Sequence, residues 1–337
     1  MALRVAITGF GRIGRLALRA VLENQRWGEV EVVAINDSST PETNAHLLKY
    51  DSVHGRYPGE IAVGEDWIDA GFGKIQKVSN RNPAELPWGD MGIDIVLECT
   101  GAFNSKDAAM AHIDAGAKRV LCSAPAKNAD KTIVYGVNHG DLTAEDIIVS
   151  NASCTTNGLA PIAKVLNDAV GIERGHVTTI HAYTGDQPTL DRNHKDLHRA
   201  RAAAMSMIPT STGAAKAVGL VLPELAGKLD GAAVRVPTPN VSLIDLVFTP
   251  GRATSKDELA DAVKAAANGP MKGVLGYDEI PLVSIDYNHD SRSSIVAVDK
   301  INVIDERLAR VMTWYDNEWG FACRMIDTTV EMGKHLK

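Results

Sequence analysis

The sequence predicts a two-domain α/β protein, with a doubly wound parallel sheet in the N-terminal domain and a mostly antiparallel sheet in a second, α+β domain. Its 337 residues are too many for one ordinary hydrophobic core, which favours two domains. The first half alternates strand-like apolar runs with segments of helical spacing, as parallel sheets do. The second half has several strand-like runs with few helices between the last four, which indicates antiparallel pairing.

A glycine-rich motif joins the first expected strand to the first expected helix. The apolar run 3–7 is followed by GFGRIG, and a second strand, 30–35, leads to Asp37 about twenty residues after the last glycine. The glycines of the motif are Gly9, Gly11 and Gly14. Such glycines let the backbone approach a pyrophosphate, and the carboxylate accepts hydrogen bonds from an adenosine ribose. The pattern predicts a Rossmann-type dinucleotide site; the alternative is a structural turn in another kind of α/β protein.

The rest of the first half continues the alternation of strands and helices. Thr100 and Ser123 come at the carboxyl ends of two expected strands, the edge at which parallel sheets bind ligands. We therefore expect both near the cofactor. The expected elements are strands 93–98, 119–123, 132–137 and 147–149 and a helix over 105–115.

The second half is expected to be richer in strands. A final helix over 317–337 carries apolar residues for packing and is long enough to return to the first domain. The other expected helices are 158–170 and 214–222, and the expected strands are 177–184, 232–236, 243–249, 282–287, 294–298 and 309–315.

The segment 150–157, SNASCTTN, lies between an apolar strand and a helix, with Cys154 at the corner. In the first turn of a helix, unpaired backbone N–H groups and the macrodipole favour thiolate over thiol. Cys154 is therefore a candidate nucleophile. The alternative is that Asn151 and Ser153 cap the helix and that Cys154 is a small buried hydrophobic residue.

A dinucleotide site combined with an activated cysteine favours aldehyde oxidation. The thiolate adds to the aldehyde, hydride passes from the hemithioacetal to nicotinamide, and a thioester remains. His181 is the candidate general base because it ends an apolar run at a strand terminus. We place the dinucleotide-binding domain at 1–150, completed by the helix 317–337, and the catalytic domain at 151–316.

The polar segment 183–209 has no clear helix or strand pattern. Structureless segments of this length in compact domains are usually functional or disordered. Arg192, Arg199 and Arg201 concentrate positive charge there, which favours an anion-binding role, whereas a solvated surface loop is the alternative.

Composition and charge limit the classes of partner. A net charge of −7 and a pI near 5.8 argue against nucleic acid and against a membrane surface. The N-terminus shows no signal-peptide pattern, and the longest apolar stretch, 218–226, contains Pro223 and Glu224. The four cysteines have no metal-ligand spacing and are expected to be free thiols in a reducing compartment. We expect a cytoplasmic location and no metal.

Six motifs across essentially the whole chain resemble phosphorylating glyceraldehyde-3-phosphate dehydrogenases. The motifs are GFGRIGR, SNASCTTN, HAYTGDQ, PTSTGAAKAVG, RVPTPNVS and YDNEWG. The resemblance implies the NAD(P)-dependent conversion of glyceraldehyde 3-phosphate and inorganic phosphate to 1,3-bisphosphoglycerate, in glycolysis, gluconeogenesis or carbon fixation. It also implies a homotetramer.

The resemblance further implies roles for individual residues. Cys154 would be the nucleophile and His181 its base. The residues implied for NAD are Gly9, Gly11, Arg12, Ile13, Gly14, Asp37, Arg81, Thr100, Ser123 and Asn317, of which Asn317 would hold the nicotinamide carboxamide. Thr184 and Arg235 would bind the substrate phosphate. The residues implied for inorganic phosphate are Ser153, Thr155, Arg199, Thr212 and Gly213.

Two departures from the family pattern concern cofactor choice. Ser38 stands where strictly NAD-dependent members usually have leucine, and Arg192-Asn193 replaces the usual Leu-Pro. These changes remove apolar bulk and add a positive charge where, in the tetrameric family, loops approach a neighbour's adenosine ribose. We expect NADP to be tolerated beside NAD, with Asp37 repelling its 2′-phosphate.

Three other functions compete with this prediction. An erythrose-4-phosphate dehydrogenase is similar in LPWGD and PLVSIDYNHD, but that relative typically loses the TSTG segment that this chain keeps. A non-catalytic nucleotide-dependent regulator or RNA-binding scaffold is disfavoured by the acidic charge. A thiol hydrolase using Cys154 and His181 would leave the dinucleotide motif without a purpose.

Overall fold

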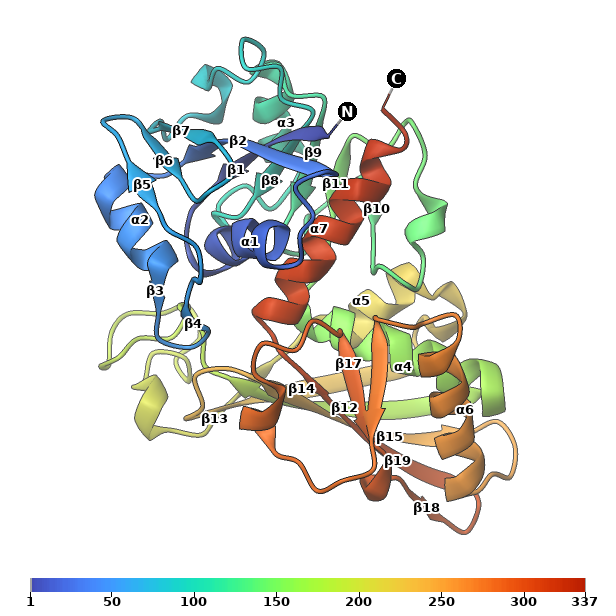
Figure 1. Cartoon of the computed structure of the whole chain (residues 1–337). Coiled ribbons are helices and arrows are strands. Elements are labelled where there is room, and N and C mark those ends of the chain that lie inside the picture. The colour runs from blue at the N-terminus through green and yellow to red at the C-terminus, as the bar shows by residue number, and fades with distance from the viewer. Residues whose placement is uncertain (1, 337) are drawn as a thin grey trace. The chain divides into compact units, whose positions relative to one another are not determined.

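The computed structural model describes residues 2–336, which form two compact units. The first unit comprises the chain up to Ser153 together with the segment from Ala322 onward, and the second is Cys154–Phe321. Helix α7, Trp319–Gly333, begins in the second unit, and its residues from Ala322 belong to the first. Figure 1 labels the elements of both units.

The first unit contains a nine-stranded sheet in the order β10-β11-β9-β8-β1-β2-β7-β6-β5. All neighbours from β10 to β7 pair in parallel, and β6 and β5 extend the edge in antiparallel fashion. The strands are β1 Leu3–Thr8, β2 Val30–Asn36, β5 Ala62–Val63, β6 Trp67–Asp69, β7 Lys74–Val78, β8 Ile95–Glu98, β9 Arg119–Cys122, β10 Lys131–Thr132 and β11 Ile148–Ser150. A separate pair, β3 Tyr50–Asp51 and β4 Gly55–Arg56, is antiparallel.

The direction of the crossovers reverses beside β1. The connection from β1 through α1 to β2 runs toward one edge of the sheet, whereas that from β8 through α3 to β9 runs toward the other. Right-handed crossovers therefore place α1 and α3 on opposite faces, which confirms the predicted doubly wound sheet. The helices and 3₁₀ turns of this unit are α1 Arg12–Glu23, α2 Pro41–Lys49, α3 Lys106–Asp114, η1 Pro83–Glu85 and η2 His139–Asp141.

The second unit contains an eight-stranded, mostly antiparallel sheet, as predicted. Its main order is β13-β14-β12-β15-β19-β17-β16, with β18 paired to β19; only β12–β14 and β16–β17 are parallel. The strands are β12 Ile172–Ala182, β13 Ile208–Ser211, β14 Leu229–Val236, β15 Ser242–Pro250, β16 Leu275–Asp278, β17 Ser294–Ala297, β18 Asn302–Ile304 and β19 Leu308–Tyr315.

Helix α4, Cys154–Val170, packs against this sheet and against two further helices. Its glycine at position 158 permits a close approach, because a Cβ there would lie 3.0 Å from the ring of Tyr315 on β19. The close packing brings the first turn of α4 to the end of the sheet where functional side chains gather. The other helices and turns are α5 Ala214–Val221, α6 Lys256–Asn268, η3 Ala203–Met205, η4 Pro223–Leu225, η5 Ser284–Tyr287 and η6 Val298–Lys300.

Two of the predicted strands are wrong. In 132–137 only the first residue belongs to β10, because the Asn138 side chain accepts from Val134 N at 2.9 Å and donates to Thr132 O at 2.9 Å, which closes a turn. In 282–287 the chain forms the 3₁₀ turn η5 instead, because Asp286 Oδ2 accepts from Val283 N at 2.8 Å. Apolar residues in both segments pack as turns rather than strands.

Candidate active site

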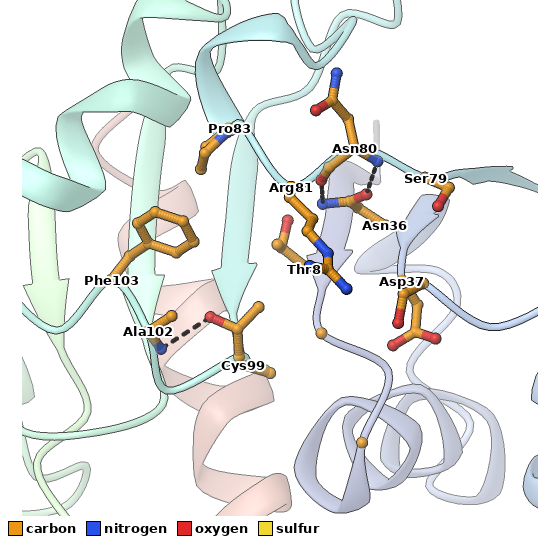
Figure 2. Close-up of a pocket in the computed structure, with 14 residues that line it drawn as sticks. Thr8, Asn36, Asp37, Ser79, Asn80, Arg81, Pro83, Cys99, Ala102 and Phe103 are labelled. Atoms are coloured by element: carbon orange, nitrogen blue, oxygen red, sulfur yellow. Dashed lines mark hydrogen bonds between the residues drawn. The ribbon is translucent and has the colours of Figure 1, made fainter.

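A cavity of about 500 Å³ opens in the first unit, where the crossovers reverse. Thr8 and Gly9 at the end of β1 and Cys99 and Thr100 after β8 line it, at the position where doubly wound sheets bind ligands. Figure 2 shows side chains from the ends of β1 and β2 and from the segments after β2, β7 and β8 around this space. Of the ten residues predicted to bind cofactor, Gly9, Gly11, Asp37, Arg81 and Thr100 line the cavity.

The glycines of the motif are required by close backbone approaches. Gly9 has φ +86°, and a Cβ there would lie 2.7 Å from Thr100 N; a Cβ on Gly14 would lie 2.1 Å from Gly9 O. Gly11, which lines the cavity, caps α1 without a side-chain hydrogen bond, so the helix begins at the cavity without a capping side chain. This arrangement suits an anionic ligand.

The carboxylate of Asp37 is held at the rim of the cavity by two backbone donors. Oδ2 accepts from Phe10 N at 3.1 Å, and Oδ1 accepts from Ser39 N at 2.8 Å. In Figure 2 the guanidinium of Arg81 extends toward the side on which Asp37 lies. Arg81 thus brings positive charge to the same space.

The other residues predicted for cofactor lie elsewhere. Arg12 and Ile13 open α1 without lining the cavity, and Arg12 forms an ion pair with Asp51 at 2.5 Å. Ser123 follows β9, where its N–H donates to Glu98 O at 3.0 Å. Asn317 belongs to the second unit.

In the second unit, Cys154 is the first residue of α4, and its Sγ lies 3.4 Å from Nε2 of His181. His181 is the penultimate residue of β12 and is buried, with 3% of its surface exposed. The Tyr315 ring stands edge-on to the imidazole at a centroid distance of 5.9 Å. The structure therefore brings the two predicted catalytic side chains together from separate elements.

Hydrogen bonds assign the proton of the neutral His181 ring. Nδ1 lies 2.7 Å from the carbonyl oxygen of Ala182, which can only accept, and 3.0 Å from Nη1 of Arg235, which can only donate; the shorter contact favours a proton on Nδ1 that it donates to Ala182. Nη1 of Arg235 donates to the same carbonyl at 3.0 Å. Nε2 is consequently left with a lone pair that faces Cys154 Sγ and accepts a proton from it.

Backbone N–H groups at the start of α4 act on Cys154 in the predicted direction, because they lower the pKa of its thiol, but burial has the larger and opposite effect. Burial raises the pKa of the Cys154 thiol, although Arg235 and the hydrogen bonds from Thr155 act in the opposite direction. Burial and the charge of Arg235 lower the pKa of His181 to about 3. Around neutral pH the pair is thus a thiol beside a neutral imidazole, because burial outweighs the helix terminus.

Arg235 and Thr184 form a candidate anion site beside His181. Nη1 of Arg235 lies 3.5 Å from Thr184 Oγ1, and burial lowers the pKa of Arg235. Its buried Nε has no hydrogen-bond partner among residues 2–336. A half-buried guanidinium whose buried Nε lacks a partner is suited to bind an anionic oxygen.

Arg199 and the start of α5 form a second polar cluster. Arg199 donates to Asp186 Oδ2 and to Thr210 Oγ1, both at 3.0 Å, and to Ser211 O at 3.2 Å. Gly213 caps α5 without a side-chain bond, while Thr212 Oγ1 accepts from Ala214 N at 3.2 Å. Thr155 Oγ1 is 2.9 Å from Tyr315 OH.

Comparison with known proteins agrees with this arrangement. A family model described as the NAD binding domain of glyceraldehyde 3-phosphate dehydrogenase matches residues 3–106, and one for the C-terminal domain matches 153–317. The chain is 66% identical to the glyceraldehyde-3-phosphate dehydrogenase of Xanthobacter flavus, over 99% of each chain. It is 62% identical to that of Cereibacter sphaeroides over the full length of both chains, and 55% identical to that of Pseudomonas aeruginosa over 98% of each.

The chain belongs to the glyceraldehyde-3-phosphate dehydrogenase family. It is therefore an oxidoreductase with an NAD-binding domain, and the predicted family is confirmed. The cavity of the first unit fits that cofactor. Besides the open start of α1 and the carboxylate of Asp37, the buried Oγ1 of Thr8 lines the cavity and lacks a hydrogen-bond partner within the described residues.

Several supporting residues of this family member escaped the sequence prediction. Tyr315 OH bridges Thr155 Oγ1 and Thr179 Oγ1, at 2.9 Å each. Ser242 accepts from Ala182 N at 3.0 Å and donates to Asn317 Oδ1 at 2.8 Å, which orients the Asn317 amide. Tyr315 and Ser242 belong to strands in which buried and more exposed residues alternate. Such a pattern predicts that a side chain is buried but not which residue it contacts.

The described residues form neither a metal-ion cluster nor a membrane-spanning helix. Residues 2–336 contain no group of three or more His, Cys, Asp or Glu side chains arranged to hold a metal ion. In the same part of the chain, no helix combines the length and apolar character that a membrane span needs. Cys99, Cys122, Cys154 and Cys323 form no disulfide within the same residues.

Proposed function

We propose that the chain catalyses the phosphorylating oxidation of glyceraldehyde 3-phosphate to 1,3-bisphosphoglycerate. The observation that carries the proposal is the 3.4 Å approach of Cys154 Sγ to the unprotonated Nε2 of His181. A thiol becomes a nucleophile when a base accepts its proton during attack, and this geometry supplies that base.

In the first step, Cys154 Sγ bonds to the aldehyde carbon while the thiol proton moves toward His181 Nε2. Return of the proton to the carbonyl oxygen gives a neutral hemithioacetal. His181 Nε2 then accepts the hydroxyl proton as the C–H bond breaks, which leaves a thioester on Cys154. NAD bound in the cavity of the first unit would supply the hydride acceptor.

In the last step, an oxygen of inorganic phosphate attacks the thioester carbon. The C–S bond breaks, the sulfur takes a proton from His181, and the acyl phosphate leaves. Arg235 and Thr184 would hold the substrate phosphate, which is supported by the unused Nε donor of Arg235. The proposed residues for inorganic phosphate are Ser153, Thr155, Arg199, Thr212 and Gly213, supported by the charge of Arg199 and by the position of Thr212 and Gly213 at the start of α5.

NADP is proposed as a second, weaker cofactor. Ser38 lines the cavity beside Asp37, where a small polar side chain leaves room for a 2′-phosphate. The carboxylate opposes that phosphate by charge repulsion. Measured kcat/KM values should favour NAD while remaining measurable with NADP, and activity with NAD alone would contradict the proposal.

The domain roles, assembly and location belong to the same proposal. Residues 1–150 with 317–337 would bind the dinucleotide, and 151–316 would carry the catalytic chemistry. A homotetramer is supported by four exposed apolar side chains within one polar segment, Leu190, Leu197, Met205 and Met207. Light scattering of the purified protein tests the tetramer, and fractionation of the source cells tests the proposed cytoplasmic location.

The function is tested by following NADH formation from glyceraldehyde 3-phosphate with and without inorganic phosphate. We expect phosphate-dependent turnover that Cys154→Ser abolishes. Erythrose 4-phosphate, assayed in parallel, should react more slowly. Near-normal turnover by the serine variant would refute the mechanism, and preference for erythrose 4-phosphate would refute the substrate.

A further inference from the structure

A polar chain runs through an otherwise apolar cluster behind the dinucleotide cavity. Trp88 and His112 are fully buried, and Glu98 has 1% of its surface exposed. They come from three places in the first unit: Trp88 follows η1, Glu98 ends β8, and His112 lies on α3. The surrounding side chains are apolar residues of one core cluster, among them Leu86, Val96, Ala109 and Val120.

The hydrogen bonds of this chain have a defined direction. The indole Nε1–H of Trp88 can only donate, so Nδ1 of His112, 3.1 Å away, is the acceptor. The neutral ring then carries its proton on Nε2, which donates to Glu98 Oε2 at 3.0 Å. Trp88 thereby directs the imidazole donor at one oxygen of Glu98.

The other oxygen of Glu98 organises the turn that forms the cavity wall. Oε1 accepts from Thr100 N at 2.8 Å and also from the Thr100 hydroxyl. Thr100 Oγ1 in turn accepts from Ala102 N at 3.0 Å, an interaction drawn in Figure 2. Gly101, between them, has φ +73°, a left-handed conformation that this tight turn requires and that glycine adopts without strain.

This turn is part of the cavity itself. Cys99, Thr100, Ala102 and Phe103 all line it. The Phe103 ring also contacts the edge of His112, with centroids 6.0 Å apart and planes at 74°. His112 therefore supports the wall at two points, through Glu98 and through Phe103.

We propose that Glu98 and His112 are positioning residues for the nicotinamide dinucleotide, because they hold the Thr100–Phe103 wall of its cavity in the binding conformation. The inference rests on the proposed NAD-dependent function. A buried carboxylate–imidazole pair loses its hydration on folding, and apolar residues of similar volume stabilise a core at least as well. Stability alone therefore does not explain the pair, whereas a role in holding the N–H and hydroxyl of Thr100 at the cavity wall does.

Glu98→Gln is the decisive variant, since it keeps the size of the side chain but replaces an acceptor with a donor. The amide then faces either Thr100 N–H or His112 Nε2–H with a donor of its own. If the variant loses the free energy of about one hydrogen bond that holds the cavity wall, NAD should bind about tenfold more weakly. We expect calorimetry to show about a tenfold higher Kd for NAD and assays to show a matching rise in KM for NAD. The kcat and the KM for aldehyde should stay within about twofold.

Two further variants separate positioning from general destabilisation. Met332→Ala removes a fully buried side chain of α7 that does not line the cavity, so it should lower the urea midpoint without changing the Kd for NAD. Trp88→Phe removes the indole donor and also leaves a cavity in the core, so it should lower the urea midpoint as Met332→Ala does but, unlike Met332→Ala, should raise the Kd, by a smaller factor than Glu98→Gln. This variant replaces Glu98→Gln as the test if the latter does not fold.

The outcomes distinguish the inference from the function on which it rests. An unchanged Kd in folded Glu98→Gln, or an equal rise in Met332→Ala, would overturn the inference. A fall in kcat with an unchanged Kd would overturn it as well. Failure of the unaltered protein to bind NAD would instead refute the proposed function.

Discussion

Nη1 of Arg235 lies 3.0 Å from Nδ1 of His181, and both atoms donate to the carbonyl oxygen of Ala182. A permanent cation, the Arg235 guanidinium, thus lies beside Nδ1 of the proposed base, whereas Nε2 of the same ring faces Cys154. The arrangement opposes protonation of the imidazole before the reaction. It also joins the proposed substrate-phosphate site to the acid–base group, so phosphate binding and proton transfer are electrostatically linked.

Arg235→Gln should raise the pKa of His181, because the charge of Arg235 is one cause of its depression to about 3. Burial remains, so the pKa should stay below its ordinary value. We expect the acidic limb of the pH profile of kcat to move to higher pH, together with a large rise in KM for aldehyde. Titration of the His181 ring protons by NMR measures the shift directly. Arg310→Gln, which removes an exposed arginine paired with Asp245, is the control and should leave the profile unchanged.

Burial of neutral His181 should make stability depend on pH in a defined window. Its pKa is about 3 in the folded chain and about 6.5 when unfolded, so the unfolded state binds more protons between these values. This contribution is fully present above pH 6.5 and is lost as the pH falls toward 3, at no more than about 1.4 kcal/mol per pH unit. Urea unfolding of His181→Gln should show a smaller loss of stability over this range than the unaltered chain. Parallel curves would exclude the effect.

Tyr315→Phe should destabilise the second unit and slow catalysis modestly. The change leaves the hydroxyls of Thr155 and Thr179 without their shared partner in a buried site, at a cost of about 1–3 kcal/mol. The ring remains edge-on to His181, so kcat should fall by less than about tenfold. Tyr287→Phe, at another buried tyrosine, is the control and should leave kcat unchanged. A loss of activity as complete as in Cys154→Ser would indicate that the hydroxyl takes part in the chemistry.

Ala152→Gly should be close to neutral for stability. Ala152 has φ +56°, two residues before Cys154, and the left-handed conformation costs a residue with a Cβ roughly 1–2 kcal/mol. The free energy gained by relieving that strain offsets two costs of the substitution: the loss of a buried methyl group and the larger conformational entropy of glycine in the unfolded chain. Ala163→Gly, at a buried position inside α4, has no strain to relieve and should cost roughly 2 kcal/mol. Equal losses in urea unfolding would show that Ala152 carries no strain.

The first unit shows how much a local pattern predicts and where it fails. The strand, glycine motif, helix and Asp37 follow from spacing, because each feature depends on residues near one another in the chain. The apolar run 132–137 was misassigned, since the turn there depends on the Asn138 side chain rather than on the apolar residues. Glu98 carries a visible signal, a carboxylate at the end of a buried strand, but its partner His112 lies on another element, α3.

The sequence by itself determined the fold class, the family and the reactive residue types, because these depend on periodicity and on short motifs. Only the tertiary structure decided that Cys154 is a thiol beside a neutral His181, since burial raises the pKa of the thiol and lowers that of the imidazole, and burial of a single side chain cannot be read from the sequence. It also decided that Tyr315 and Ser242 contact functional groups far from them in the chain. Hydrogen bonds between distant strands create those roles, and spacing along the chain does not encode which strands become neighbours.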